Sequence, residues 1–321
     1  MGTGCRDARP REPYTKGFAM KITVLLGGPS AEREVSLVSG AAVARGLREV
    51  GHEVFESDIS PSDLSGLGRA ADVVFPALHG AWGESGELQE ILEQRGIPFV
   101  GSGSMASRLG MDKAATKRAW EAAGLPTPPY RVIKAGEDVG EVPTSCVVKA
   151  IDSGSSIDVY VCKAPAEGSA AAASNAIATI LAKHGRVLVE QYIDGPELTV
   201  GLLEERPLAP IRIVAKGEFF DYQAKYKAND TEHRFDTGLP ADVVERCRAL
   251  AERANAVVGA RDLARVDIML DQGHRPYLLE INTLPGFTPK SLLPEAAGHA
   301  GIGFGALVDR LARRAYERGP K

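Results

Sequence analysis

The segment that most restricts the fold is a short apolar run, Lys21–Leu26, which ends abruptly in Gly27-Gly28-Pro29-Ser30. Apolar residues then recur with helical spacing from Glu34 to Val50. Because glycine and proline interrupt regular structure, this order predicts a strand, a tight loop and an amphipathic helix. A chain that opens in this way is typical of an α/β lobe with a parallel sheet.

The next segments extend this lobe and indicate where it binds ligands. Gly51 ends the helix and Glu53–Glu56 predicts a second strand. Asp72–Leu78 is nearly continuously apolar, as expected of a strand that is buried on both faces. Polar loops follow two of the strands, at Ser30 and at His79. Since ligands collect at the carboxyl ends of strands in open α/β sheets, we expect a binding site at this edge.

The rest of the chain alternates strands and helices. A helix is predicted from Asp112 to Gly124, where the proline-rich segment Leu125–Pro129 ends it. Cys146–Ile151 and Val159–Lys163 predict a hairpin. The other expected strands are Val187–Tyr192, Leu198–Leu203, Ile211–Val214, Ala264–Leu270 and Pro276–Ile281, and the other expected helices are Ala164–Lys183 and Ala241–Val258. A loop punctuated by proline and glycine, Asn282–Leu293, is expected after the last strand.

Length and composition exclude several classes of protein. The 321 residues, of which 44% are apolar and 25% are charged, can bury a substantial core in two or three lobes. The net charge of −4 and the lack of basic runs with interleaved aromatics argue against a nucleic-acid partner. No segment offers the ~18 consecutive apolar residues that a membrane span requires. We therefore expect a protein that binds neither nucleic acid nor membranes.

The cysteines and the N-terminus indicate the cellular compartment. The cysteines are Cys5, Cys146, Cys162 and Cys247. They are far apart in the sequence and lack the paired spacing of a zinc or redox site, so free thiols in a reducing cytoplasm are expected. Residues 1–19 contain four Arg or Lys, two prolines and no apolar core of a signal peptide. We expect a disordered extension there and a functional start at Met20.

The strongest chemical signal is a set of polar residues on two neighbouring predicted strands. Arg265 and Asp267 lie two apart on one strand, so both project to the same face. Glu280 and Asn282 have the same spacing at the end of the next strand. Two carboxylates and an amide offer the oxygen ligands that Mg²⁺ prefers, and a neighbouring arginine can stabilise developing negative charge. A solvated polar face is the alternative, which the apolar residues on both sides disfavour.

Glycine, serine and lysine residues elsewhere suggest contacts to phosphate. The loop Gly154-Ser155-Ser156 can offer backbone N–H groups and hydroxyls, although most loops of this composition are simple turns. Lys113, Lys149 and Lys225 can each supply a positive charge, although an isolated lysine usually lies on the surface. Only the combination indicates a phosphate site.

Two residues at strand ends have two possible roles each. Glu32 could hold a substrate ammonium group, or it could lie in the first turn of a helix and favour the helix dipole. His79, just before Gly80, could be catalytic or a hydrogen-bonded structural histidine. Composition does not decide between these roles.

Glu32, His79, Lys225 and Asn282 belong to four long motifs by which the chain, from Met20 to its C-terminus, resembles the D-alanine:D-alanine ligases of the ATP-grasp superfamily. The motifs are Gly27–Leu37, His79–Gly86, Asp221–Tyr226 and Asn282–Leu292. Four motifs in the order of the family do not coincide by chance. The resemblance implies that the chain joins two D-alanines with ATP, through an acyl phosphate, for peptidoglycan precursors.

The resemblance also implies the fold, the cofactors and the assembly. The expected fold is an α/β protein with α+β lobes, of ATP-grasp type. A Rossmann-like substrate lobe is expected at residues 20–112, a small central lobe at 113–189 and a C-terminal lobe with the metal site at 190–321. ATP and D-alanine are the expected small-molecule partners, and two Mg²⁺ ions are expected, with Mn²⁺ as an alternative. A homodimer is the expected assembly.

The resemblance also implies a role for individual residues, both within these motifs and outside them. Asp267, Glu280 and Asn282 would hold the metal ions, and Arg265 with the backbone N–H of Gly286 would stabilise the tetrahedral oxyanion. ATP would be bound by Lys113, Lys149, Ser156, Glu190, Gln191, Tyr192, Ile193, Glu197 and Lys225, with residues 190–193 as the adenine-binding hinge and residue 197 at the ribose. The ammonium of the first D-alanine would be held by Glu32, with loop closure through Ser155 and Tyr226. Substrate would also be bound by His79, Ser291 and Leu292, the last two at the carboxylate of the second D-alanine.

The sequence departs from the family pattern at four positions. Ser85 stands where Asp is usual, Ala150 where Pro is common and Phe287 where Met is usual. Asp158 occupies a position that is usually Gly. A carboxylate there would be repelled by ATP phosphates, at a cost of ~1 kcal/mol if solvated, unless it points outward. No departure removes an expected metal ligand.

Three other functions are compatible with parts of the sequence. The same framework serves ligases that make D-alanyl-D-lactate or D-alanyl-D-serine, although Tyr226 favours the dipeptide. A nucleotide-binding paralogue with impaired catalysis would fit Asp158 and Ser85. A nicotinamide-dependent oxidoreductase is suggested only by the first strand, loop and helix, which lack the third glycine of the dinucleotide fingerprint.

Overall fold

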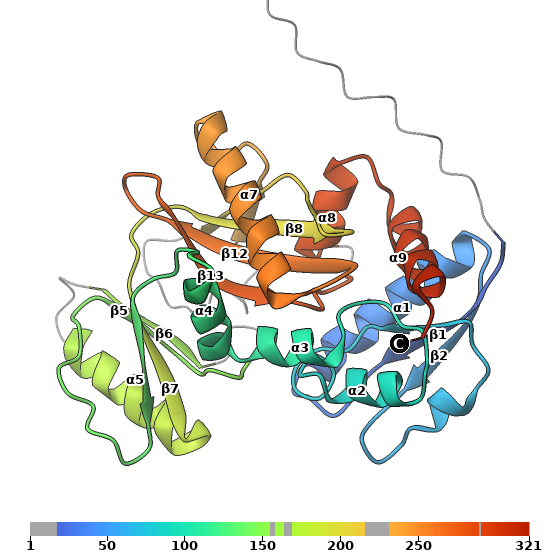
Figure 1. The fold of residues 1–321 in the computed structure, drawn as a ribbon, viewed down its shortest axis with the longest axis horizontal. Helices are drawn as coiled ribbons and strands as arrows, with labels where there is room; N and C mark the ends of the chain where they lie inside the picture. The colour runs from blue at the N-terminus through green and yellow to red at the C-terminus, as the bar shows by residue number, and fades with distance from the viewer. Residues whose placement is uncertain (1–17, 155–157, 164–168, 216–230, 289, 321) are drawn as a thin grey trace, which may run out of the picture.

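The strands of the protein are divided among three sheets. The computed structural model describes residues 18–154, 158–163, 169–215, 231–288 and 290–320. Within these ranges the sheets have three, four and six strands (Figure 1). None of the described helices combines the length and the apolar character needed to cross a bilayer.

The N-terminal sheet is parallel, as its opening strand, loop and helix predict. Its elements are β1 (Lys21–Leu26), β2 (Glu53–Asp58), β3 (Val73–Pro76), the 3₁₀ helix η1 (Ser65–Gly68), and helices α1 (Arg33–Glu49), α2 (Glu87–Gln94) and α9 (Phe304–Arg318). β1 lies between β2 and β3, and both pairings are parallel. Ile22 and Val24 pack with α1 and α9, whereas Leu25 packs with α2 on the other face. The last helix of the chain thus covers the sheet that its first strand begins (Figure 1).

The central sheet is antiparallel and covered by one helix. Its elements are β4 (Tyr130–Lys134), β5 (Cys146–Lys149), β6 (Val159–Cys162), β7 (Arg186–Gln191) and α5 (Ser169–His184). The strand order is β4-β7-β5-β6, and the predicted hairpin of β5 and β6 is confirmed. α5 packs Ile177 and Ile180 against this sheet.

Two cysteines that are distant in sequence lie directly opposite each other in the central sheet. Cys146 of β5 pairs with Cys162 of β6, and both are buried free thiols, as is Cys247. Burial raises the pKa of Cys146 to about 11. The expectation of free thiols is therefore confirmed for the described cysteines, and burial keeps them in the unreactive thiol form.

One face of the C-terminal sheet packs against the core, and the other carries the polar residues of the predicted site, so we call it the chemical face. Its elements are β8 (Glu197–Leu203), β9 (Arg206–Pro207), β10 (Ile211–Ala215), β11 (Thr231–Arg234), β12 (Leu263–Leu270), β13 (Pro276–Asn282), and helices α3 (Ser104–Met111), α4 (Lys113–Ala122), α7 (Ala241–Val258) and α8 (Leu292–His299). The strand order is β11-β10-β8-β12-β13. Val200, Val266 and Ile268 face a core that includes Trp120 of α4 and residues of α7. Alternation along each strand sends the intervening residues to the opposite face.

Most predicted elements are present, with ends that differ by a few residues, and the helix Ala241–Val258 has the predicted bounds. Helices α2, α3, α8 and α9 and strands β4, β9 and β11 were not predicted. The predicted loop 282–293 is wrong at its end, because α8 begins at Leu292. Pro294 is compatible with this helix since it lies in the first turn, where backbone N–H groups have no partner within the helix.

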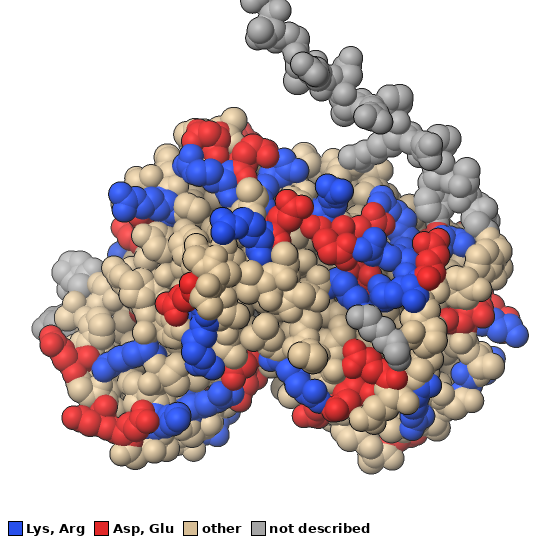
Figure 2. All heavy atoms as spheres, viewed as in Figure 1, with Lys and Arg blue, Asp and Glu red and all other residues tan. Residues whose placement is uncertain are grey.

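A buried aspartate joins the N-terminal lobe to α9 and to the C-terminal sheet. Asp262, just before β12, is fully buried and accepts a hydrogen bond from the backbone N–H of Gly101 at 2.8 Å. Arg314 and Arg318 of α9 donate to the same carboxylate, Arg318 at 2.6 and 2.9 Å. Figure 2 shows charged side chains of both signs gathered over α9, without an extended area of one sign on that face.

Removing this carboxylate tests its contribution to stability. We expect Asp262→Ala to lower the free energy of unfolding by about 3 kcal/mol, because it leaves the buried N–H of Gly101 without this acceptor and removes the carboxylate that balances Arg314 and Arg318. The two arginines retain Glu205 and the carbonyl of Phe99 as acceptors. The control is Asp242→Ala, since Asp242 pairs with Arg246 on the exposed surface of α7 and should contribute little. Urea denaturation followed by circular dichroism measures both. Equal midpoints for the two variants would contradict the assignment.

Candidate active site

Two adjoining pockets lie along the chemical face of the C-terminal sheet. The first, which we call the inter-sheet pocket, has a volume of about 550 Å³ and lies between the central and C-terminal sheets, with Val147, Gln191 and Met269 in its wall. The second, the inter-lobe pocket, has a volume of about 400 Å³ and lies between the N-terminal lobe and the C-terminal sheet, with Glu32 and Asn282 in its wall. Both volumes suit small-molecule ligands.

The residues predicted to hold metal are brought together by the pairing of β12 with β13. Arg265 lies opposite Asn282, and Asp267 lies opposite Glu280. The register shifts just after Asp267, which ends this paired row with a bulge. Cross-strand partners share a face of the sheet, so all four side chains project to the side away from the α7 core. The two carboxylates and the amide are therefore neighbours, as predicted.

Among the described residues, Arg265 and Thr199 hold Asp267 in place. Arg265 makes a two-pronged ion pair with it, with Nε at 3.0 Å from Oδ1 and Nη2 at 2.9 Å from Oδ2. Thr199 of β8 donates its hydroxyl to Oδ1 at 2.5 Å. Sequence analysis missed Thr199, because its contact depends on the pairing of β8 with β12. Each carboxylate oxygen keeps capacity for another partner.

Lys113 connects the metal-binding candidates to the loop after β5. Its Nζ donates to the carbonyl of Ser153 at 2.7 Å and lies 3.5 Å from Oε2 of Glu280. The side chain of Asp112 caps α4 by accepting from the N–H of Ala115 at 2.7 Å, which fixes where Lys113 leaves the helix. A positive charge beside the carboxylates, near a glycine loop, suits a phosphate.

The donor set suits Mg²⁺ with a nucleotide. Among the described residues, no three His, Cys, Asp or Glu side chains form a metal-binding group by themselves. The candidate site instead offers two carboxylates and the amide of Asn282, whose Oδ1 also accepts from the N–H of Leu284 at 2.9 Å. Mg²⁺ typically takes one or two carboxylates and completes its shell with water and phosphate oxygens, so these residues fit it.

Glu32 lies where the first glycine loop meets α1. It is the residue before α1, its side chain makes no capping hydrogen bond, and its N–H donates to Ser30 Oγ at 3.1 Å. Its carboxylate faces two glycines, since a Cβ would lie 2.9 Å from Oε2 at Gly80 and 3.5 Å away at Gly154. The structure thus brings Glu32 to the inter-lobe pocket and to the loop after β5.

His79 is both hydrogen-bonded and part of the inter-lobe pocket. Its Nε2 lies 3.1 Å from Ser39 Oγ, and its Nδ1 lies 3.1 Å from Oε1 of Glu84. It is 7% exposed and lies beside Gly286, where a Cβ would be 3.6 Å from its Cε1. His79 is therefore hydrogen-bonded, as expected of a structural histidine, and it also lines the pocket, as expected of a catalytic one.

The segment before α8 forms the opposite wall of the inter-lobe pocket. A Cβ on Gly286 would lie 2.9 Å from Oγ of Ser291, so glycine lets the backbone approach that hydroxyl. Ser291 Oγ also accepts from the N–H of Thr288 at 3.0 Å. Leu292 is the first residue of α8, whose N-terminus carries unpaired N–H groups that favour an anion.

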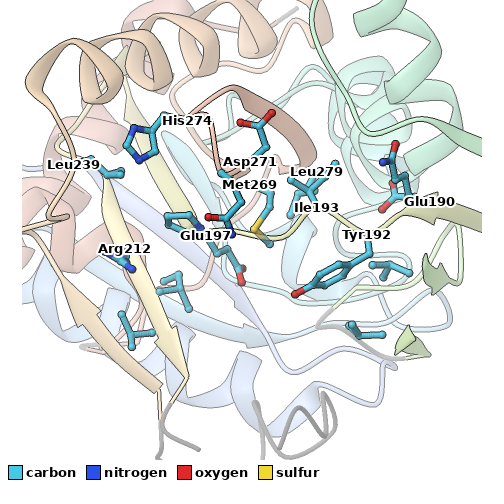
Figure 3. A pocket seen from close by; sticks show the side chains of 18 of the residues that line it. Glu190, Tyr192, Ile193, Glu197, Arg212, Leu239, Met269, Asp271, His274 and Leu279 are labelled. Atoms are coloured by element: carbon cyan, nitrogen blue, oxygen red, sulfur yellow. The ribbon is translucent and has the colours of Figure 1, made fainter. Parts of the chain in front are cut away.

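The hinge residues predicted to bind a base line the inter-sheet pocket. Gln191, Tyr192 and Ile193 lie at and after the end of β7, and Glu197 begins β8. Val147 and Met269 contribute apolar surface from the two sheets. Met269 is labelled in Figure 3. Apolar walls with a few polar groups at the edge suit a flat heterocycle.

Glu190 is placed differently from its neighbours in the hinge. Its side chain is 1% exposed and pairs with Lys149 and with Lys117, both at 2.6 Å. Burial alone would raise the pKa of Glu190, but the two lysines outweigh it and lower the pKa to about 2. Sequence analysis missed Lys117, although its position one turn after Lys113 on α4 was a signal.

Asp158 points away from the expected phosphate site. Its carboxylate accepts from Lys183 at 2.6 Å and from His184 at 2.7 Å, both at the end of α5. Burial alone would raise the pKa of Asp158, but these two hydrogen bonds lower it. Its φ of +57° explains why glycine is usual at this position, and Asp is among the residues that tolerate such a backbone.

The other departures are accommodated by local contacts. The N–H of Ala150 donates to the carbonyl of Asp158 at 3.0 Å, a bond that proline could not make. Ser85 Oγ accepts from the N–H of Trp82 at 3.0 Å, as a carboxylate could. Phe287 packs edge-on against Phe75 with ring centroids 5.3 Å apart.

Several predicted site residues lie outside the described residues. These are Ser155, Ser156, Lys225 and Tyr226, together with the rest of the Asp221–Tyr226 motif. Their predicted roles stay predictions.

Comparisons with known proteins agree with this arrangement. Family models described as D-ala D-ala ligase N-terminus and D-ala D-ala ligase C-terminus match residues 60–102 and 119–313. The D-alanine–D-alanine ligase of Gloeobacter violaceus is 43% identical over 93% of this chain and 100% of its own length. That of Geobacter sulfurreducens is 42% identical over 91% of this chain and 92% of its own length.

Solved structures show the same likeness. A D-alanine–D-alanine ligase from Bacillus anthracis, complexed with ATP, is 30% identical, with a TM-score of 0.80 over 94% of this chain and 98% of that one. A second structure of the Bacillus anthracis ligase is 32% identical, with a TM-score of 0.82. The match extends over nearly the whole of both chains.

Two substitutions at Asp158 separate the backbone requirement from the ion pair. Both variants lose the contacts to Lys183 and His184, but Asp158→Ala keeps a Cβ in the left-handed backbone, whereas Asp158→Gly removes that Cβ. We expect the alanine variant to be less stable than the glycine variant by about 1 kcal/mol, measured as urea midpoints. Equal midpoints would contradict this.

The same aspartate predicts a pH dependence. Because its pKa is lowered in the folded protein, its contribution is present above the ordinary value of 3.8 and is lost as the pH falls through the lower, folded value. The stability advantage of the wild type over Asp158→Gly should therefore shrink only in acid. An advantage that disappears already near neutral pH would contradict this assignment.

Proposed function

We propose a function from the premise that this chain belongs to the D-alanine–D-alanine ligase family, whose C-terminal model alone matches residues 119–313. The protein has the ATP-grasp fold. It is an ATP-dependent ligase that joins two D-alanines to D-alanyl-D-alanine for peptidoglycan synthesis. The observation that carries the assignment of residues is the pairing of Asp267 with Glu280 on a face that borders both pockets.

We infer that ATP occupies the inter-sheet pocket. Adenine would lie between the apolar side chains of Val147 and Met269, at the backbone of Gln191, Tyr192 and Ile193. Glu197 at the start of β8 suits the ribose hydroxyls. The phosphates would then extend toward Lys149 and Lys113, which lie at the two ends of this path. Ser156 and Lys225 are proposed to add contacts from outside the described residues.

The proposed metal ligands lie at the inter-lobe pocket, which Glu280 and Asn282 line and where Asp267 lies opposite Glu280 on the neighbouring strand. Asp267, Glu280 and Asn282 would hold two Mg²⁺ ions, or Mn²⁺ in their place, which would neutralise the charge of the terminal phosphates. Arg265 keeps Asp267 oriented through its two-pronged ion pair and leaves its own charge beside the reacting group. Lys113 adds a further charge next to Glu280.

The first D-alanine would bind in the inter-lobe pocket with its ammonium at Glu32. Its carboxylate oxygen attacks the γ-phosphorus of ATP, ADP leaves, and an acyl phosphate results. Ser155 and Tyr226 are proposed to link with Glu32 and to close the site against water. Arg265 and the N–H of Gly286 would stabilise the oxyanion that forms when the second amine attacks.

The second D-alanine would bind at the N-terminus of α8. Its carboxylate would accept hydrogen bonds from Ser291 and the N–H of Leu292, where the helix end favours negative charge. His79, beside Gly286, would border this substrate. The amine then displaces phosphate from the acyl carbon and the peptide bond forms.

The assembly and the location in the cell are also proposals. We propose a homodimer in the cytoplasm, as the resemblance implies. The buried free thiols of the central sheet are compatible with a reducing compartment. The mixed charges in Figure 2 give no support for a nucleic-acid partner on that face.

A paralogue with impaired catalysis is the second candidate, and its arguments are weak. Asp158 pairs with Lys183 and His184, so it does not oppose the phosphates as a solitary charge. Ser85 makes a local backbone contact. All three proposed metal ligands are present.

Replacing a metal ligand tests the proposed site. We expect Glu280→Ala and Asn282→Ala each to lower D-alanine-dependent phosphate release from ATP by about 100-fold or more, because phosphoryl transfer depends on the charge they position. Asn175→Ala, on the exposed surface of α5, is the control and should keep full activity. Near-normal rates in either test variant would overturn the metal assignment.

The choice of acceptor tests the product. With D-alanine as acceptor, the rate should rise as the pH is raised above neutrality, because the ammonium must lose a proton before it attacks. D-lactate, which attacks through a hydroxyl, should give little product throughout, and D-serine should be a poor acceptor. Product analysis by chromatography at each pH measures this. A preference for D-lactate or D-serine would favour the alternative ligases.

A further inference from the structure

A buried cluster of three charges lies beneath the inter-sheet pocket. Glu190 of β7 is 1% exposed, and its two oxygens each meet a different lysine. Lys117 Nζ lies 2.6 Å from Oε1, and Lys149 Nζ lies 2.6 Å from Oε2. Both lysines are buried as well, Lys117 completely. We call Lys117, Glu190 and Lys149 the charge triad.

Each member of the triad comes from a different element. Lys149 ends β5, and Glu190 lies on the neighbouring strand β7, opposite Val147. Lys117 comes from α4, one turn after Lys113. Its Nζ also donates to Thr127 Oγ1 at 2.5 Å, and Thr127 donates in turn to the carbonyl of Leu278 on β13. Lys117 therefore ties the central sheet to the C-terminal sheet.

Only two members of the triad reach the pocket. Lys149 and Glu190 line it, whereas Lys117 does not. A ligand in the pocket can therefore meet the charges of Lys149 and Glu190 directly. Such a ligand makes no direct contact with Lys117, which acts on it by balancing the charge of Glu190.

The net charge of the triad determines how strongly it attracts an anion in the pocket. A buried pair of one carboxylate and one ammonium is neutral and attracts an anion weakly. Glu190 is ionised at neutral pH, since its pKa is lowered to about 2 by the two lysines despite its burial. Burial lowers the pKa of Lys117, while the contact with Glu190 opposes that shift. With Lys117 protonated as a second partner for that carboxylate, the triad keeps one net positive charge at the pocket wall. Low exposure to water makes such a charge effective.

We propose that Lys117 is a positioning residue for the nucleotide: it balances the charge of Glu190, so that the charge of Lys149 stays available to ATP phosphates. This rests on the proposed binding of ATP in the inter-sheet pocket. Lys117 itself touches neither the nucleotide nor the reacting atoms.

The decisive comparison is between nucleotides that differ only in their phosphates. We expect Lys117→Met to bind ADP and ATP about tenfold more weakly than the wild type, by isothermal titration calorimetry. Binding of adenosine, measured by saturation-transfer NMR, should be unchanged, because adenosine carries no phosphate. Lys117→Arg keeps the charge and should bind ADP within about twofold of the wild type.

A second substitution can restore the balance without restoring the lysine. In Lys117→Met with Glu190→Gln, both buried charges are removed, and Lys149 regains an unopposed charge. Because Glu190 also belongs to the proposed adenine-binding hinge, the readout is the ratio of ADP affinity to adenosine affinity, which should return toward that of the wild type. A role in folding alone does not predict this recovery. Thermal unfolding of every variant shows which of them are folded at the assay temperature.

Three results would overturn the proposal. Lys117→Met could bind ADP as tightly as the wild type, it could lose adenosine and ADP to the same extent, or the double variant could show the same ratio of ADP to adenosine affinity as the single one. The proposed function fails separately, if the wild type itself shows no ATP binding and no D-alanine-dependent phosphate release.

Discussion

The antiparallel pairing of β12 with β13 is the constraint on which the rest of the site depends. It sets Arg265 against Asn282 and Asp267 against Glu280, while Val266 and Ile268 face the core under α7. A slip of one residue would exchange the two faces and would bury carboxylates among apolar side chains. Hydrophobic burial on one face thus fixes the position of the chemical groups on the other.

Charge is distributed so that each buried group has an opposite partner. Asp267 is held by Arg265, Glu190 by two lysines, and Asp262 by two arginines of α9. Since an unpaired buried charge is costly, the pair of Glu190 with Lys117 and the pairs of Asp262 with α9 also fix how these elements meet. The departure from the family pattern at Asp158 follows the same rule. Asp158 stands where glycine is usual, and Lys183 and His184 pair with its carboxylate.

The spacing of apolar and polar residues predicted much of the fold. It also predicted the polar face of the C-terminal sheet. The helix Ala241–Val258 and the strands that carry Asp267 and Glu280 follow from spacing alone, since the residues that decide them are neighbours in sequence. The return of α9 to the first sheet could not be predicted in this way. The same holds for Lys117, whose partner Glu190 is distant in sequence, and for the left-handed backbone of Asp158, which only the resemblance hinted at.

The central claim is that the paired row on β12 and β13 is where metal and nucleotide meet. The most direct test is the anomalous difference density of a crystal grown with Mn²⁺ and a non-hydrolysable ATP analogue. The account predicts peaks within coordination distance of Asp267, Glu280 and Asn282, with the adenine in the inter-sheet pocket. Manganese bound elsewhere, or a nucleotide outside that pocket, would contradict it.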